Sequence, residues 1–142
     1  MKKRYSFGLF LEAWIFLHWA WFKIQLASFQ TIAENLGTAQ FETPVNEIFT
    51  DYLMSMKAAL RRAGKYSLHR SNCYDQALAA MMLCRKRKIP ATIYFGLSKS
   101  EEGLKAHAWL RCGTGIITGA AVKHNYTPVA WYGTTFNPSL KS

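Results

Sequence analysis

The sequence lacks the patterns that mark several large classes of protein. Its three cysteines are an odd number and include no C-x-x-C pair, so neither a disulfide framework nor a zinc site is indicated. There is no low-complexity tract or internal repeat, and half of the 142 residues are apolar, which excludes the composition typical of disorder. We therefore expect a folded protein of a reducing compartment, the cytoplasm, with no metal and no cofactor.

Acidic residues are scarce. Eight Asp and Glu residues stand against 18 Lys and Arg residues, which gives a net charge of +10. A charge of this size attracts nucleic acid, anionic membranes or acidic polypeptides. The basic residues form no recognisable nucleic-acid-binding motif with the aromatic residues, so nucleic acid is not expected as a partner.

An uninterrupted apolar segment is also missing. The basic start and the apolar run that follows are similar to a signal peptide or a membrane span, but Glu12 and Lys23 interrupt the run. Each of these charges would cost about 2.5–3.5 kcal/mol near the centre of a bilayer, and no small-residue cleavage site follows. We expect a helix that is covered by protein or rests on a membrane surface, and both alternatives stay open.

The length of the chain suits one hydrophobic core, so we predict a single domain over residues 1–142. An apolar helical region is expected over 1–37, further helices over 45–88 and a sheet over 89–136. The predicted fold class is α+β, in which helices come first and a small antiparallel sheet follows.

Apolar residues at three- and four-residue steps predict three helices. They run from about Leu9 to Phe29, from Val45 to Arg62 with Gly64 as the stop, and from Cys73 to about Arg87. Ser71 or Asn72 can cap the third helix.

The pattern changes after Pro90 and predicts short strands. They are expected at Ala91–Leu97, Ala106–Cys112, Gly115–Thr118 and Val129–Tyr132, with a polar loop at Ser98–Gly103.

Cys73 is the candidate nucleophile because it is expected at the start of the third helix. A thiol attacks carbonyl groups as the thiolate, and a helix N-terminus lowers the pKa of a thiol placed there. The free N–H groups of the same helix turn can receive the oxyanion that forms. Cys84 and Cys112 are expected on buried faces and are assigned to the core.

His107 is the candidate base because it lies in a strand that can pack against the third helix. The other histidines lie in the apolar first helix, in the basic approach to Cys73 and in a loop: His18, His69 and His124. Alternation along the strand puts His107, Trp109 and Arg111 on one face, which we expect to meet the start of the helix. The spacing alone also fits a buried cysteine and a structural histidine.

Three stretches resemble the lasso-peptide biosynthesis B proteins of the transglutaminase-like superfamily. They occur in order over nearly the whole chain: Leu11-Glu12-Ala13 opening an aromatic-rich helix, Arg70-Ser71-Asn72-Cys73 leading through an alanine-rich helix to Arg87-Lys88-Ile89-Pro90-Ala91, and Ala106-His107-Ala108-Trp109-Leu110.

The resemblance implies a papain-like or transglutaminase-like cysteine peptidase fold with Cys73 as nucleophile and His107 as base. The implied activity is removal of the leader from a ribosomally made precursor before macrocyclisation. The chain has no room for the leader-binding domain that some of these proteins carry, so it is similar to the stand-alone form. The implied partners are the precursor leader, a small separate leader-binding protein and the macrocyclising synthetase.

One departure from the family pattern concerns the group that orients the histidine. The pattern usually has an aspartate on the next strand, whereas no Asp or Glu follows Glu102 here. Thr118, Asn125 or a backbone carbonyl would then have to hold the ring.

Two other functions stay open: transfer of the acyl group to an amine, and an inactive module that binds a peptide or scaffolds other proteins.

Overall fold

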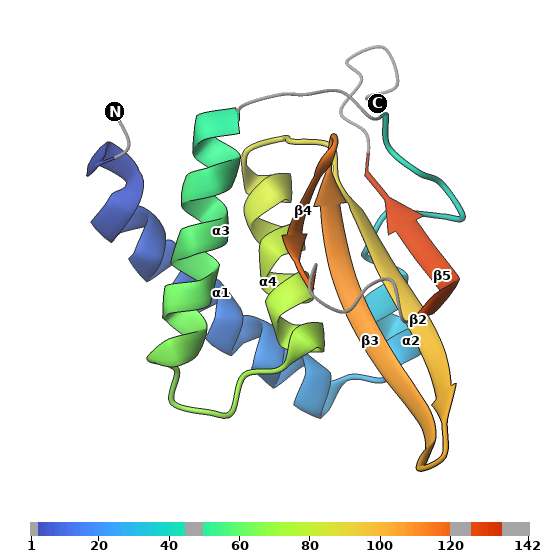
Figure 1. The fold of residues 1–142 in the computed structure, drawn as a ribbon. Helices are drawn as coiled ribbons and strands as arrows, with labels where there is room; N and C mark the ends of the chain where they lie inside the picture. The colour runs from blue at the N-terminus through green and yellow to red at the C-terminus, as the bar shows by residue number, and fades with distance from the viewer. Residues whose placement is uncertain (1–2, 45–49, 120–125, 135–142) are drawn as a thin grey trace.

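The structure is a computed structural model that describes residues 3–44, 50–119 and 126–134. The helices are α1 (Lys3–Leu26), α2 (Phe29–Ala33), α3 (Thr50–Lys65) and α4 (Cys73–Lys86). Helices α1, α3 and α4 lie on one side of a five-stranded sheet (Figure 1). Apart from one short strand between α2 and α3, helices precede the sheet, so the α+β class is confirmed.

All neighbouring strands in the sheet are antiparallel. The order is β1-β5-β2-β3-β4. The strands are β1 (Thr38–Ala39), β2 (Thr92–Ser100), β3 (Gly103–Cys112), β4 (Gly115–Thr118) and β5 (Thr127–Gly133). Strand β4, next to the helices (Figure 1), forms one edge of the sheet. Strand β1 forms the other edge.

The hairpin between β2 and β3 is longer than the sequence pattern indicates. Pairing continues until Ser100 lies opposite Gly103, so the loop predicted at 98–103 was wrong. The two residues of the turn are Glu101 and Glu102. Polar side chains are compatible with this extension because backbone groups supply the ladder hydrogen bonds.

The first predicted helix is two helices in the structure. Helix α1 begins at Lys3 and ends at Leu26, and a new helix starts at Phe29. The break occurs at Ser28, whose hydroxyl oxygen accepts a hydrogen bond from the Thr31 N–H and caps α2.

Gly64 is not the end of α3, because the helix continues to Lys65. A Cβ atom at position 64 would lie 2.5 Å from Gln76 Nε2, so the glycine allows close approach of α3 to α4. The start predicted at Val45 lies outside the described residues. Helix α4, by contrast, begins at Cys73 as predicted.

The core lies between α1, α3, α4 and the sheet. Helix α1 buries one side against α3 and α4, and α4 in turn packs against β3 and β4. The sulfur atoms of Cys84 in α4 and Cys112 in β3 lie 3.3 Å apart, so these two cysteines belong to the core as expected. None of the described helices has the length and apolarity needed to cross a bilayer.

Candidate active site

Cys73 is the first residue of α4, and the residue before it caps the helix. The Asn72 side-chain oxygen accepts hydrogen bonds from the N–H groups of Tyr74 and Asp75 at 2.9 and 3.1 Å. The Asp75 carboxylate accepts one from the Asn72 N–H at 3.0 Å. This reciprocal arrangement is a capping box, so of the two predicted caps Asn72 is the one used.

The cap determines which backbone donors remain for a substrate. The N–H groups of Tyr74 and Asp75 are bound by the Asn72 side chain, and that of Gln76 donates to the Asn72 carbonyl oxygen at 3.1 Å. Among the described residues, no acceptor is found for the N–H of Cys73 itself. The expected set of oxyanion donors therefore narrows, within the first turn of α4, to the backbone N–H of Cys73.

Asp75 connects residues 69–75, which contain the candidate nucleophile Cys73 and are named the nucleophile turn for that reason. Its side chain is fully buried, and its carboxylate accepts hydrogen bonds from Ser71 Oγ at 3.0 Å and from His69 Nε2 at 2.8 Å, besides the one from Asn72. A buried carboxylate is costly unless hydrogen bonds satisfy its oxygens. Here both oxygens have donors.

Helix α1 contacts the nucleophile turn through aromatic rings. The ring of His69 stacks on Trp21 with centroids 5.1 Å apart. It also meets the edge of His18 at 5.0 Å. His18 Nε2 accepts from the Leu68 N–H at 3.0 Å, so its proton is on Nδ1 and is donated to the Trp14 carbonyl oxygen at 2.7 Å. His69 Nδ1 is buried with no partner in the described part of the chain.

Sequence reasoning did not find the pair of His69 and Asp75. The available signal was weak, because an aspartate in the first turn of a helix is already explained by the helix dipole. The contact with His69 depends on the path of the chain from α3 to α4, and residue spacing does not reveal that path.

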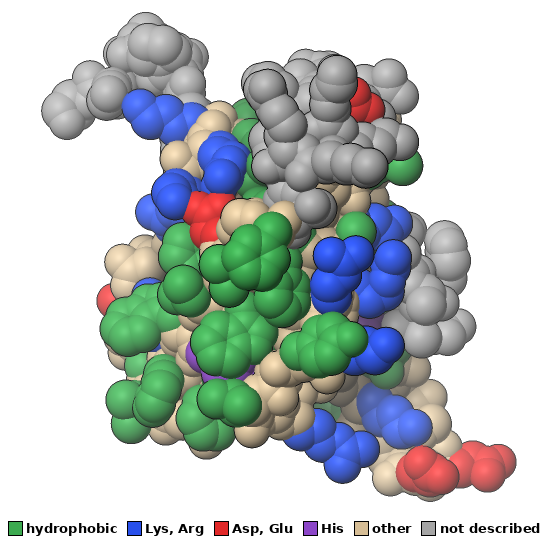
Figure 2. Space-filling view, turned by 90° about the vertical axis from the view of Figure 1, so that its left-hand side faces the viewer, with side chains coloured by type: hydrophobic (Ala, Val, Ile, Leu, Met, Phe, Trp, Pro, Cys, Tyr) green, Lys and Arg blue, Asp and Glu red, His purple; other side chains and the backbone are tan. Residues whose placement is uncertain are grey.

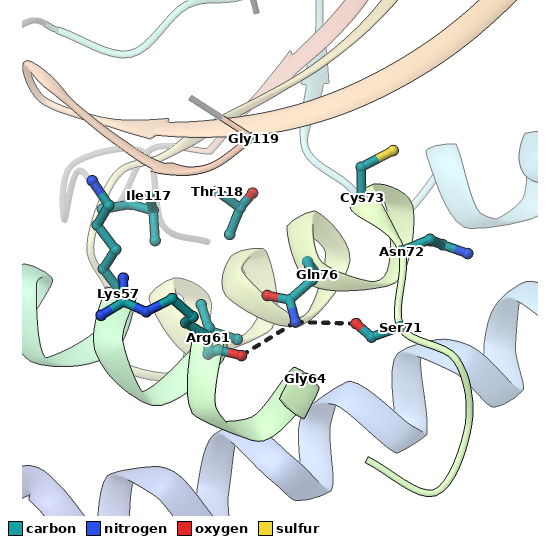
Figure 3. Close-up of a pocket in the computed structure, with 11 residues that line it drawn as sticks. Lys57, Arg61, Gly64, Ser71, Asn72, Cys73, Gln76, Ile117, Thr118 and Gly119 are labelled. Carbon is teal, nitrogen blue, oxygen red and sulfur yellow. Dashed lines mark hydrogen bonds between the residues drawn. The ribbon is translucent and has the colours of Figure 1, made fainter. Parts of the chain in front are cut away.

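A pocket of about 640 Å³ lies at the start of α4. It is lined by residues of α3, of the nucleophile turn and α4, and of the sheet edge: Lys57, Leu60, Arg61, Gly64, Ser71, Asn72, Cys73, Gln76, Ile117, Thr118 and Gly119. Figure 3 shows Lys57 and Arg61 on one side and Cys73 on the other. Gln76 joins the two helices, since its Nε2 donates to the Leu60 carbonyl oxygen at 3.2 Å and to Ser71 Oγ at 3.1 Å.

The face of β3 that carries His107 does not pack against α4. The opposite face does, because Ala108, Leu110 and Cys112 belong to the core. The expectation that the His107 face meets the helix start was therefore wrong. On its own face the His107 ring stacks with Trp109 at 5.9 Å and with Tyr126 at 5.0 Å.

His107 nevertheless lies beside the pocket. Its Nε2 is 3.3 Å from the Gly119 carbonyl oxygen, and Gly119 lines the pocket together with Cys73. A Cβ atom at Gly119 would lie 2.9 Å from that nitrogen, and the φ of +80° also favours glycine. No hydrogen bond joins the side chains of Cys73 and His107, both of which are described.

Of the groups expected to orient His107, the structure shows a backbone carbonyl, that of Gly119. The hydroxyl of Thr118 is buried without a partner among the described residues, so it does not bind the ring. Asn125 lies outside the described residues. In the described ranges, no group of three or more His, Cys, Asp or Glu side chains is arranged to hold a metal ion.

Comparison with known proteins gives one match. The sequence model of the transglutaminase-like superfamily matches residues 16–130, a range that includes Cys73, His107 and all residues lining the pocket. Neither a curated protein nor a solved structure matches. This superfamily includes cysteine peptidases and acyltransferases. Because the match covers most of its length, the chain belongs to the transglutaminase-like superfamily.

Proposed function

We propose that this protein is a cysteine peptidase that removes the leader from a lasso-peptide precursor before macrocyclisation. The observation that carries the proposal is the position of Cys73, partly exposed at the capped start of α4 in a pocket that also borders the His107 contact. Superfamily membership and the likeness of three sequence stretches to lasso-peptide B proteins support it.

In the proposed reaction, the Cys73 thiolate attacks the carbonyl carbon at the end of the leader and forms a tetrahedral intermediate. The Cys73 N–H donates to its oxyanion. His107 takes the thiol proton and gives it to the amine of the core peptide, which leaves as a thioester forms on Cys73. Water then attacks the thioester, which releases the leader with a free carboxylate and restores the thiol.

His107 has to change its contact for this chemistry. Its Nε2 faces the Gly119 carbonyl oxygen, and a proton shuttle needs it within hydrogen-bond reach of the Cys73 sulfur. We infer that substrate or a partner protein completes this arrangement. The partners that fit the proposal are the precursor leader, a separate leader-binding protein and the macrocyclising synthetase.

The proposal is tested by mixing the protein with its precursor and leader-binding protein and following peptide masses. Two fragments, of which the leader ends in a carboxylate, are expected, and Cys73→Ala abolishes their formation. Cys84→Ala is the matched control, because Cys84 is buried in the core, and it retains cleavage. Full cleavage by Cys73→Ala would refute the mechanism, and a joined product would instead indicate acyl transfer.

One observation favours a second candidate function, a module that binds the precursor without cutting it. His107 has no carboxylate partner among the described residues and its strand face is turned away from α4. In that case, the wild-type protein would bind the leader in a pull-down yet yield no fragments, and Cys73→Ala would bind equally well.

A further inference from the structure

The outer side of α1 is apolar and exposed. Six large side chains recur along it at three- and four-residue steps, and between 42% and 82% of each is exposed: Phe7, Leu11, Ile15, Trp19, Phe22 and Leu26. The opposite side of the helix is buried in the core. From Phe7 to Leu26, at 1.5 Å per residue, the exposed side is about 29 Å long. An apolar surface of this extent marks an interaction site.

The loop between α3 and α4 enlarges this surface. Tyr66 and Leu68 are both exposed, and hydrogen bonds hold their backbones to α1: Trp14 Nε1 donates to the Tyr66 carbonyl oxygen at 3.1 Å, and the Leu68 N–H donates to His18. We call the six α1 residues with Tyr66 and Leu68 the α1 surface. Figure 2 shows the apolar side chains gathered on this side of the molecule, with Lys and Arg side chains around them.

The charges near the α1 surface are positive. Lys23 lies on α1, Lys65 is 5.6 Å from the Tyr66 ring, and Arg70 is exposed just after Leu68. The single acid of α1, Glu12, is only 13% exposed and forms ion pairs with Lys86 and Arg87. An approaching anion therefore meets cations and no free carboxylate of α1.

We propose that the α1 surface binds an anionic phospholipid bilayer, with α1 lying parallel to the membrane plane. Aromatic and aliphatic side chains enter the boundary between headgroups and acyl chains, and the cations at the rim contact lipid phosphates. The helix lies on the bilayer and does not cross it, because its inner side is fixed in the protein core.

Two features favour a bilayer over a second copy of the chain. Two copies would bring together surfaces with the same positive rim, in a protein whose net charge is +10. Most of the surface is also one side of a long helix with Trp and Phe residues, which suits the interface of a membrane. The inference does not depend on peptidase activity.

The test is flotation of the full chain with vesicles of phosphatidylcholine alone or mixed with phosphatidylglycerol. We expect binding to the anionic vesicles that weakens as salt is raised. The double variant Ile15→Glu, Trp19→Glu should bind the anionic vesicles at least about tenfold more weakly than the wild type. The matched control is Leu104→Glu, at a leucine near the tip of the β2–β3 hairpin that is at least as exposed as Ile15 and Trp19, and it should bind like the wild type.

Circular dichroism establishes that each variant is folded. A second variant, Lys23→Glu with Lys65→Glu, keeps all apolar residues of the α1 surface. It should bind anionic vesicles more weakly and leave binding to phosphatidylcholine vesicles unchanged. Failure of the wild type to float with anionic vesicles would overturn the proposal. So would equal loss of binding in Leu104→Glu, or a dimer in light scattering that the Ile15→Glu, Trp19→Glu variant abolishes while vesicles stay unbound.

Discussion

At the residue scale, the nucleophile turn depends on one buried carboxylate. Asp75 closes the capping box with Asn72, holds Ser71 and pairs with His69, so its two oxygens connect residues before and within α4. The local part of this arrangement was predictable, since an asparagine followed three residues later by an acid is a helix-start signal. The pairing with His69 was not, because it depends on the path of the chain from α3 to α4.

Replacing Asp75 by asparagine should reduce stability. The variant keeps the shape but loses the charge that His69, Ser71 and the Asn72 N–H share, so we expect the free energy of unfolding to fall by about 2 kcal/mol or more. Urea denaturation followed by circular dichroism measures it. The matched control is Asp51→Asn, an exposed aspartate in the first turn of α3, which should change stability by less than about 0.5 kcal/mol.

At the scale of elements, local signals predicted some boundaries and missed others. Helix α4 starts where its cap and periodicity indicated, because both act within a few residues. The two-residue strand β1 pairs with β5, more than 90 residues later in the chain, so no local pattern reveals it. The extension of β2 to Ser100 was missed because its outer residues are polar, although backbone pairing does not require apolar side chains.

The contact between α1 and the end of α4 should depend on pH through Glu12. Burial would raise the pKa of Glu12, but hydrogen bonds from Arg87 and Lys86 outweigh it and lower the pKa below 4.5. Because the folded pKa is lowered, the stabilisation is present above pH 4.5 and is lost as pH falls through the folded value.

Glu12→Gln should therefore destabilise the protein by about 1 kcal/mol at neutral pH, and the difference should vanish in acid. Thermal melts of the wild type and of Glu12→Gln, from neutral pH down to acid, measure this difference in stability. Glu102→Gln removes a carboxylate that is 81% exposed and pairs with Lys105, and this control should leave the melting temperature unchanged. A Glu12→Gln effect that stayed constant with pH would contradict the ion-pair explanation.

At the scale of the whole molecule, the sequence indicated which residues could form the site but not how the sheet faces the helices. Alternation separates His107 and Trp109 from Ala108 and Leu110 without saying which set packs on α4. The small and aliphatic set does so, because it fits against the alanine-rich helix. The pair of Cys73 and His107 therefore stays a prediction.

Burial across the molecule predicts how its three thiols react. Cys73 is partly exposed, whereas Cys84 and Cys112 are buried. The hydrogen bond with Cys112, together with burial, raises the pKa of Cys84. Iodoacetamide should add one group to the native protein, at Cys73, and the other two only after unfolding in urea, as read by peptide mass mapping.

In the native protein, iodoacetamide should alkylate Cys73 about tenfold or more faster than the core thiols. Cys73→Ala provides the control and should show no fast adduct. Equal labelling of all three cysteines in the native state would mean that the core between α4 and β3 opens readily.

The attachment of α1 to the loop before α4 also bears on how the chain folds. Trp14 and the Tyr66 carbonyl are 52 residues apart, and His18 and Leu68 are 50 residues apart. Contacts of this kind require closure of a long loop before they return any stabilisation. The nucleophile turn should therefore take its final shape late in folding. A chain cut short before α4 would leave the inner side of α1 packed against α3 alone, without its second partner.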